Sequence, residues 1–125
     1  MTTSDPRVVV DSIVEAYNAK DFARLEGLFA EDVHVVHHNR GVEAANRKEL
    51  FGLFDAFGAA FPDRQFSNRR AVNIDGETVV VQHTWGGTAA GDVPGFAAAG
   101  EKVSLDLCTV LRVQGGVVVE YHDYG

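Results

Sequence analysis

Val117-Val118-Val119-Glu120-Tyr121-His122-Asp123-Tyr124 is the stretch that decides the fold. It begins with three valines and ends with side chains that can hold or move a proton. In an extended strand, side chains alternate between two faces, so the odd-numbered residues from Val117 to Asp123 share one face. The stretch therefore predicts a strand with an apolar run that ends in a carboxylate. A dry pocket around Asp123 could tune its pKa for acid–base chemistry; the alternative is an exposed carboxylate at a frayed strand end.

The length and composition of the 125-residue sequence predict one globular domain, residues 1–125. A chain of this length buries about two-thirds of its surface on folding, which is enough for one core without disulfides or metals. The residues are 46% hydrophobic and 23% charged, as in ordinary soluble domains. Cys108 stands alone inside an apolar run, so we expect a buried, unpaired thiol.

Charge and hydrophobic patterning exclude several partners. The formal net charge is −7 and no basic block offsets it, so we expect neither nucleic acid nor an anionic membrane as a partner. No apolar stretch is long enough to cross a bilayer. The polar residues 1–5 lack the basic and apolar regions of a signal peptide. A cytoplasmic location is therefore expected.

Three helices are expected in the first half of the chain. Ser4-Asp5-Pro6 is a helix start, because a capping side chain precedes a proline whose missing N–H costs nothing there. Asp21 caps a short second helix. Asn46, with Glu49 three residues later, is close to a capping box for the third. The third helix carries a core-type stripe that could also floor a pocket: Leu50, Phe51, Phe54, Phe57 and Phe61.

The remaining segments are expected to be strands and loops. A β-branched strand at Val33–His38 and a polar loop at Asn39–Ala45 separate the second helix from the third. After the third helix, four strands joined largely by tight turns are expected at Gln65–Ile74, Thr78–Trp85, Lys102–Val113 and Val117–Tyr124. The Gly- and Ala-rich residues 86–100 are expected to form a loop. This order predicts an α+β fold with helices on one face of a curved antiparallel sheet.

The same alternation decides which side chains can meet. On the strand before the Gly-rich loop, His83 and Trp85 share a face. On the following strand, one face is expected to point toward the pocket or core: Leu105, Leu107, Thr109 and Leu111. Asp106 then points to the opposite face, as do Glu120 and His122 on the last strand.

Asp123 and His83 form the candidate catalytic pair. An imidazole beside a carboxylate can support the ionised carboxylate or gain basicity from it. A core histidine satisfied by one structural hydrogen bond is an equally supported alternative. His37 and Asn39 share a strand face; facing inward, they could hold a substrate carbonyl or a water, and otherwise they are polar groups at a strand end.

The histidines raise the question of a metal site. His34 and His38 are about 13 Å apart along a strand and cannot chelate one ion. His37, His83 and Asp123 could form a set of two histidines and one carboxylate, an arrangement known for iron. Nothing in their spacing demands an ion, so the expectation is no metal and no cofactor.

The ending Tyr121–Tyr124 completes a series of short motifs with Leu28–Val33, Ala60–Asp63, His83–Thr88 and Gly115–Glu120. In order and spacing, this series resembles the SnoaL-like polyketide cyclase family of the nuclear transport factor 2-like superfamily, which includes ketosteroid isomerases and limonene epoxide hydrolases. The resemblance implies a cone-shaped, cystatin-like fold, with a curved antiparallel or mixed sheet wrapped around three helices from the N-terminal half. It also implies a homodimer through the convex face of the sheet, which should carry Asp106, Cys108, Val110 and Glu120.

The resemblance matches Asp123 to the last-strand aspartate that acts as general acid/base in SnoaL-like cyclases. The Asp-Arg-Asp set of limonene epoxide hydrolases is incomplete, because His83 and Trp85 stand at the other two positions. Ketosteroid isomerases have a tyrosine and a late-strand aspartate near the positions of Ile13 and Thr109. Both of these mechanisms are therefore disfavoured.

The expected function is cofactor-free acid–base chemistry on a small, mostly apolar carbonyl compound: aldol-type cyclisation, isomerisation or hydration. Asp123 would be the acid/base, His83 its partner, and His37 and Asn39 polar orienters. The residues expected to shape the pocket are Trp85, Leu105, Leu107, Thr109 and Tyr121. The alternatives are a non-catalytic ligand-binding or dimerisation module on the same fold, a limonene-epoxide-hydrolase-like hydrolase and a metal-binding protein.

Overall fold

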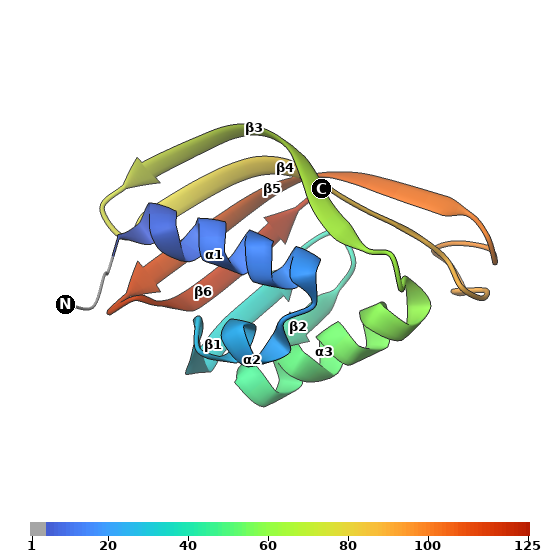
Figure 1. Ribbon diagram of the computed structural model, residues 1–125, viewed down its shortest axis with the longest axis horizontal. Helices are drawn as coiled ribbons and strands as arrows, with labels where there is room; N and C mark the ends of the chain where they lie inside the picture. The colour runs from blue at the N-terminus through green and yellow to red at the C-terminus, as the bar shows by residue number, and fades with distance from the viewer. Residues whose placement is uncertain (1–4) are drawn as a thin grey trace.

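A six-stranded sheet organises the computed structural model, which describes residues 5–125 (Figure 1). The strands lie in the order β2-β1-β6-β5-β4-β3, and all neighbours are antiparallel except β1 and β6, which are parallel. The sheet is mixed, curved and unclosed, with three helices, which confirms the predicted fold class. The strands are β1 Phe29–His37, β2 Val42–Ala44, β3 Gln65–Asp75, β4 Thr78–Thr88, β5 Lys102–Gln114 and β6 Val117–Tyr124.

The helices α1 (Pro6–Ala19), α2 (Phe22–Glu26) and α3 (Arg47–Ala60) lie on one side of the sheet (Figure 1). Helix α1 packs on β3 and β4, and α3 packs on β1. The predicted caps are confirmed for all three helices, whose first free N–H groups are satisfied by the side chains of Asp5, Asp21 and Asn46. Ser4, the other residue of the predicted first cap, lies outside the described residues. No helix within residues 5–125 is long and apolar enough to span a membrane.

Two segments predicted as loops contain strand residues. Val42–Ala44 forms β2 on the edge of the sheet, because Ala44 reaches the core while the backbone pairs with β1. Strand β4 continues past Trp85 to Thr88, where it still pairs with β5. Gly87 allows this extension, since a Cβ there would lie only 3.0 Å from the Cβ of Phe61.

A β-bulge near the start of β6 changes the faces of its valines. The register between β5 and β6 shifts between Arg112 and Val113, which leaves Val119 as the extra residue. Val118 is consequently fully buried, whereas Val117 and Val119 are only partly buried. The prediction that Val117 and Val119 form the apolar run behind the carboxylate is wrong, because the bulge moves Val118 into that place. Beyond the bulge the predicted alternation holds.

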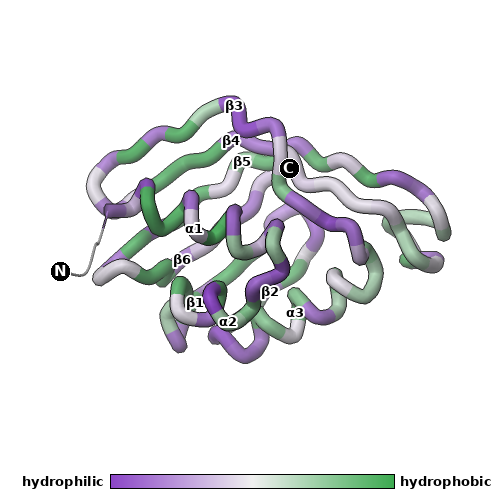
Figure 2. Tube along the Cα trace, in the orientation of Figure 1, coloured by the Kyte–Doolittle hydropathy of each residue, from purple (hydrophilic) through white to green (hydrophobic). Residues whose placement is uncertain are grey.

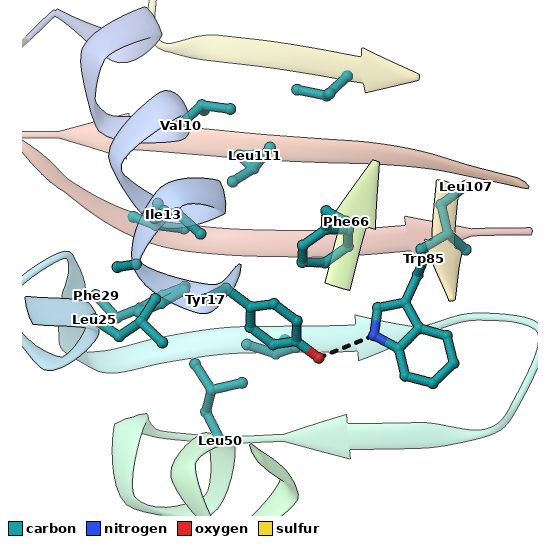
Figure 3. Packing of buried hydrophobic residues seen from close by; sticks show 14 of the residues in the cluster. Val10, Ile13, Tyr17, Leu25, Phe29, Leu50, Phe66, Trp85, Leu107 and Leu111 are labelled. Carbon is teal, nitrogen blue, oxygen red and sulfur yellow. Dashed lines mark hydrogen bonds between the residues drawn. The ribbon is translucent and has the colours of Figure 1, made fainter. Parts of the chain in front are cut away.

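The core fills the space between the helices and the concave face of the sheet (Figure 3). Hydrophobic residues follow β4 and β5 behind α1 (Figure 2). One hydrogen bond crosses this core: the Trp85 Nε1–H donates to the Tyr17 hydroxyl over 2.9 Å (Figure 3). The Cys108 thiol is only partly buried, which corrects the expectation of a fully buried one, because its position on β5 points away from the core.

Candidate active site

A cavity of about 80 Å³ lies between α1, α3 and the concave face of the sheet. Most of its wall is aliphatic or aromatic: Ile13, Phe29, Val35, Leu50, Leu53, Phe54, Phe57, Phe66, Phe96, Leu105 and Leu107. The remaining lining residues bring polar atoms to this apolar space: Tyr17, His37, Arg40, Trp85, Tyr121 and Asp123. Apolar walls with a few convergent polar groups are typical of small-molecule sites.

Asp123 lies at the centre of the polar group, and its side chain is only 4% exposed. The sheet register explains its surroundings, because Asp123 is paired with His37 on β1 and with Thr109 on β5. Its Oδ2 lies 3.1 Å from His37 Nδ1, and its Oδ1 accepts a 2.5 Å hydrogen bond from the Thr109 hydroxyl. The His37 side chain is 26% exposed, so it connects the buried carboxylate with solvent.

His83 reaches the carboxylate only through Thr109. Its Nε2 lies 2.9 Å from Thr109 Oγ1, and its ring stacks on Phe66 with centroids 4.6 Å apart. Burial lowers the pKa of His83 to about 4, although the charge of Asp123 opposes this shift. The imidazole is therefore neutral at pH 7. Because Thr109 donates its hydroxyl proton to Asp123, His83 must donate its Nε2–H to Thr109.

The two tyrosines of the cavity are held as neutral phenols. Burial raises the pKa of Tyr121 well above 10, and the charge of Asp123 adds to the shift. Burial also raises the pKa of Tyr17, while the hydrogen bond from Trp85 and the nearby Arg64 guanidinium oppose it. Since the Tyr17 oxygen accepts the Trp85 N–H, its own O–H remains available as a donor.

Arg40 brings a permanent positive charge to the cavity. Its Nη1 donates to the carbonyl oxygen of Gly125 at 2.5 Å, and its guanidinium lies 5.6 Å from the centroid of the Phe96 ring. Phe96 belongs to the predicted loop after β4, so this contact ties the loop to the turn that follows β1. Such a cation–π contact is worth roughly 0.5–1 kcal/mol when exposed.

Five of the seven residues predicted to bind substrate line the cavity: His37, Trp85, Leu105, Leu107 and Tyr121. Thr109 faces the same side of the sheet but is buried behind Asp123, and His83 lies behind Thr109. The predicted direct pairing of His83 with Asp123 is therefore replaced by a bridge. Asn39 is exposed and does not line the cavity, because β1 ends at His37 and the chain turns before it.

Two polar residues of the cavity were not found from sequence. Tyr17 lies among the apolar side chains that α1 buries, so its hydroxyl gave no separate signal in the sequence. Arg40 was assigned to a polar loop, and nothing in that loop indicated that it packs against Phe96. The aromatic stripe of α3 does floor the cavity, through Leu50, Phe54 and Phe57.

The arrangement is suited to moving one proton in an apolar space. Asp123 can accept a proton only at a carboxylate oxygen, and Oδ1 already accepts the Thr109 hydroxyl. The His83–Thr109–Asp123 chain thus orients the carboxylate, while His37 contacts the other oxygen. Neutral phenols and the Arg40 guanidinium are donors for an oxygen that gains negative charge.

The fold and the buried carboxylate together define an α+β protein in which a curved, unclosed mixed sheet and the helices enclose an apolar pocket. The family model described as a SnoaL-like domain matches residues 10–121, so the chain belongs to the SnoaL-like family. No curated protein matches the sequence.

Several solved structures share the fold. IdmH from Streptomyces antibioticus, a candidate polyketide cyclase, is 21% identical; the match covers 96% of this chain and 91% of IdmH, with a TM-score of 0.79. A candidate polyketide cyclase from Xanthomonas campestris is 20% identical. The match covers 96% of this chain and 89% of the cyclase chain, with a TM-score of 0.84. A protein of ketosteroid isomerase-like fold from Catenulispora acidiphila, in complex with trimethylamine, is 21% identical, with coverages of 99% and 87% and a TM-score of 0.78.

Proposed function

We propose that this protein is a cofactor-free acid–base enzyme that acts on a small, mostly apolar carbonyl compound. The observation that carries the proposal is the buried Asp123 carboxylate, which lines an apolar cavity between His37 and Thr109. A buried carboxylate that borders an apolar space and contacts a histidine and a hydroxyl group can act as a general acid or base. Aldol-type cyclisation, isomerisation and hydration are the reactions that fit.

For the aldol type, the proposed steps balance without another reactant. Asp123 takes a proton from the carbon next to a carbonyl group, and the electron pair of that C–H bond forms an enolate. Tyr17, Tyr121 and Arg40 are the lining donors that can stabilise the enolate oxygen. The enolate carbon then attacks a second carbonyl of the substrate, and Asp123 returns the proton to the new alkoxide.

The size of the cavity limits the proposed substrate. Pockets for drug-sized ligands have volumes of roughly 300–1,000 Å³, whereas this cavity encloses about 80 Å³. A compound of a few heavy atoms fits as the protein stands. A polyketide-sized substrate requires movement of the segment around Phe96, which forms part of the wall.

The test begins with a thermal-shift screen of small carbonyl compounds, followed by turnover measurements with those that bind. Asp123→Asn keeps the size and hydrogen bonding of the side chain but removes proton transfer, so turnover should fall by roughly 10²–10⁴ while binding survives. The matched control is Asp106→Asn, since Asp106 is 81% exposed on the opposite face of the sheet. Full turnover in Asp123→Asn would contradict the proposal.

A non-catalytic ligand-binding module is the second candidate. It is favoured by the small number of polar atoms in the wall and by the contacts that already surround Asp123, from His37, Thr109 and Tyr121. In that case, ligands from the screen would bind equally well to wild type and Asp123→Asn, and neither protein would turn them over.

The proposal also includes a homodimer formed through the convex face of the sheet. Cys108 and Val110 lie on that face and are partly buried within one chain, and Asp106 is exposed beside them. A mixed face of this kind can be covered by a second copy. Light scattering at micromolar concentration should give the mass of two chains, and a monomer would count against the dimer. The cytoplasmic location expected from the sequence stays a prediction.

A further inference from the structure

A second cluster of histidines and carboxylates lies on the convex face of the sheet, opposite the cavity. His34 on β1 is the register partner of Glu120 on β6, and His122 follows Glu120 on the same face of β6. Glu120 and His122 were predicted to point outward, and their contacts with His34 agree with that placement. The sequence placed Glu120 on the expected dimer face and indicated no role for His122.

We propose that His34, Glu120 and His122 bind one divalent transition-metal ion of the Zn²⁺ type. Each of these residues offers one ligand atom, and the three ligand atoms lie within 4.8 Å of one another. Glu120 Oε2 lies 3.1 Å from His34 Nδ1 and 2.9 Å from His122 Nε2. Ligands of a tetrahedral zinc ion lie about 3.3 Å apart, given bond lengths near 2.0–2.1 Å. The two distances from Glu120 Oε2 are already close to this spacing, and the third, between the two imidazole nitrogens, is at most 4.8 Å.

The outer partners of both imidazoles favour metal binding. His34 Nε2 lies 2.5 Å from Glu43 Oε2, and His122 Nδ1 lies 2.9 Å from His38 Nε2. Both ring nitrogens of His34 face carboxylate oxygens, so an ion would replace the Nδ1 proton while Glu43 keeps accepting the Nε2–H. Metal-binding histidines usually have such a partner on the second ring nitrogen, which fixes the tautomer and the ring orientation.

The ligand types select the class of ion. Two imidazoles and one carboxylate suit Zn²⁺ and its first-row neighbours, whereas Mg²⁺ and Ca²⁺ prefer oxygen ligands alone. Three protein ligands leave a position for water, and the side chains of His34 and Glu120 are 40% and 30% exposed, so solvent can reach the ion. Arg112 also lines this hollow.

The ion would cross-link β1 and β6 directly behind the cavity. These strands form the parallel pair of the sheet, and they carry His37 and Asp123 on the other face. All three ligands come from one chain, so no second copy is needed to complete the site, although it lies on the face that the proposed dimer would cover. It is also independent of the proposed catalysis, because none of the ligands lines the cavity.

The test is calorimetric titration of the untagged chain with Zn²⁺ at neutral to slightly alkaline pH, where protons compete least. Wild type should bind one ion per chain. Glu120→Gln and His122→Gln should each weaken binding by more than about 100-fold, and Glu43→Gln by roughly 10–100-fold as an outer partner. Glu31→Gln, an exposed change on the same strand β1, should bind like wild type.

A second measurement on wild type guards against variants that misfold. In NMR spectra of the histidine rings, Zn²⁺ should shift the signals of His34 and His122 and leave His83 unchanged. Absence of saturable binding would overturn the proposal. So would binding that survives both Glu120→Gln and His122→Gln, or Zn²⁺-induced shifts at His37 and His83 in place of His34 and His122.

Discussion

The two faces of the β1–β6 pair carry the same chemical groups in different surroundings. On the concave face, Asp123 lies 3.1 Å from His37; on the convex face, Glu120 lies 3.1 Å from His34. The Asp123 side chain is 4% exposed and borders an apolar cavity, whereas the Glu120 side chain is 30% exposed. A histidine–carboxylate pair alone therefore indicates no function. Its surroundings decide between proton transfer in a dry site and ion binding near solvent.

The protonation of the histidines follows the same division. On the concave side, burial lowers the pKa of His83 to about 4. On the convex side, the hydrogen bond to Glu43 is the largest cause of a raised pKa for His34. Burial alone would raise the pKa of Glu120, but its hydrogen bonds to His122 and His34 outweigh burial and lower it. The buried His83 is thus neutral, whereas His34 holds a proton more readily and would release it when an ion binds.

The largest effect that would sharpen this comparison is the pH dependence of stability caused by His83. Its pKa is about 4 in the folded protein and 6.5 in the unfolded chain, so the unfolded chain binds the proton more readily. The contribution of His83 to the free energy of unfolding is fully present above pH 6.5. It is lost as the pH falls toward 4, and the total loss is about 3 kcal/mol. The free energy of unfolding is measured by chemical denaturation at pH 7 and at pH 4. Between these two pH values it should fall by about 3 kcal/mol less in His83→Gln than in wild type.

The control for this prediction is Gln82→Ala, an exposed change at the neighbouring position of β4. It should keep the pH dependence of wild type. Equal pH dependence in wild type and His83→Gln would mean that the buried imidazole accepts a proton without cost, and the contrast between the two faces would fail.

A smaller effect is expected from the hydroxyl group that joins His83 to Asp123. Thr109→Val keeps the shape of the side chain but leaves Asp123 Oδ1 and His83 Nε2 without their shared partner. Unsatisfied buried polar groups cost about 1–3 kcal/mol, so the free energy of unfolding should fall by about 2 kcal/mol. Thr78→Val, at the exposed start of β4, should change it by less than about 0.5 kcal/mol. A neutral Thr109→Val would show that the bridge does not hold the carboxylate.

Local patterns in the sequence were enough to predict much of the fold. Helix starts were predictable because each capping side chain accepts a hydrogen bond from a backbone N–H only two or three residues away, as for Asp5, Asp21 and Asn46. Asp123 was predicted to face inward from alternation along β6; it does so, but the bulge at Val119 breaks the alternation that was expected to place Val117 and Val119 on the same face. The edge strand β2 was missed, since three residues carry too short a pattern to separate strand from loop.

The partners of Asp123 depend on pairings between distant segments. His37 meets Asp123 because β1 and β6 run parallel, and no local pattern sets that register. Thr109 stands between His83 and Asp123 because β5 lies between β4 and β6. The bulge at Val119 likewise arises from the fit of β6 against β5 rather than from the valines themselves. Sequence could therefore propose the members of the site but not their contacts.

The most direct test of the central claim, that Asp123 moves a proton, is deuterium exchange into a bound ketone. A ketone identified by thermal shift is incubated with protein in D₂O, and loss of its α-hydrogens is followed by proton NMR. Wild type and Asp106→Asn should accelerate the exchange equally above the buffer rate, and Asp123→Asn should reduce that acceleration by roughly 10²–10⁴. Exchange in Asp123→Asn as fast as in wild type would contradict the claim.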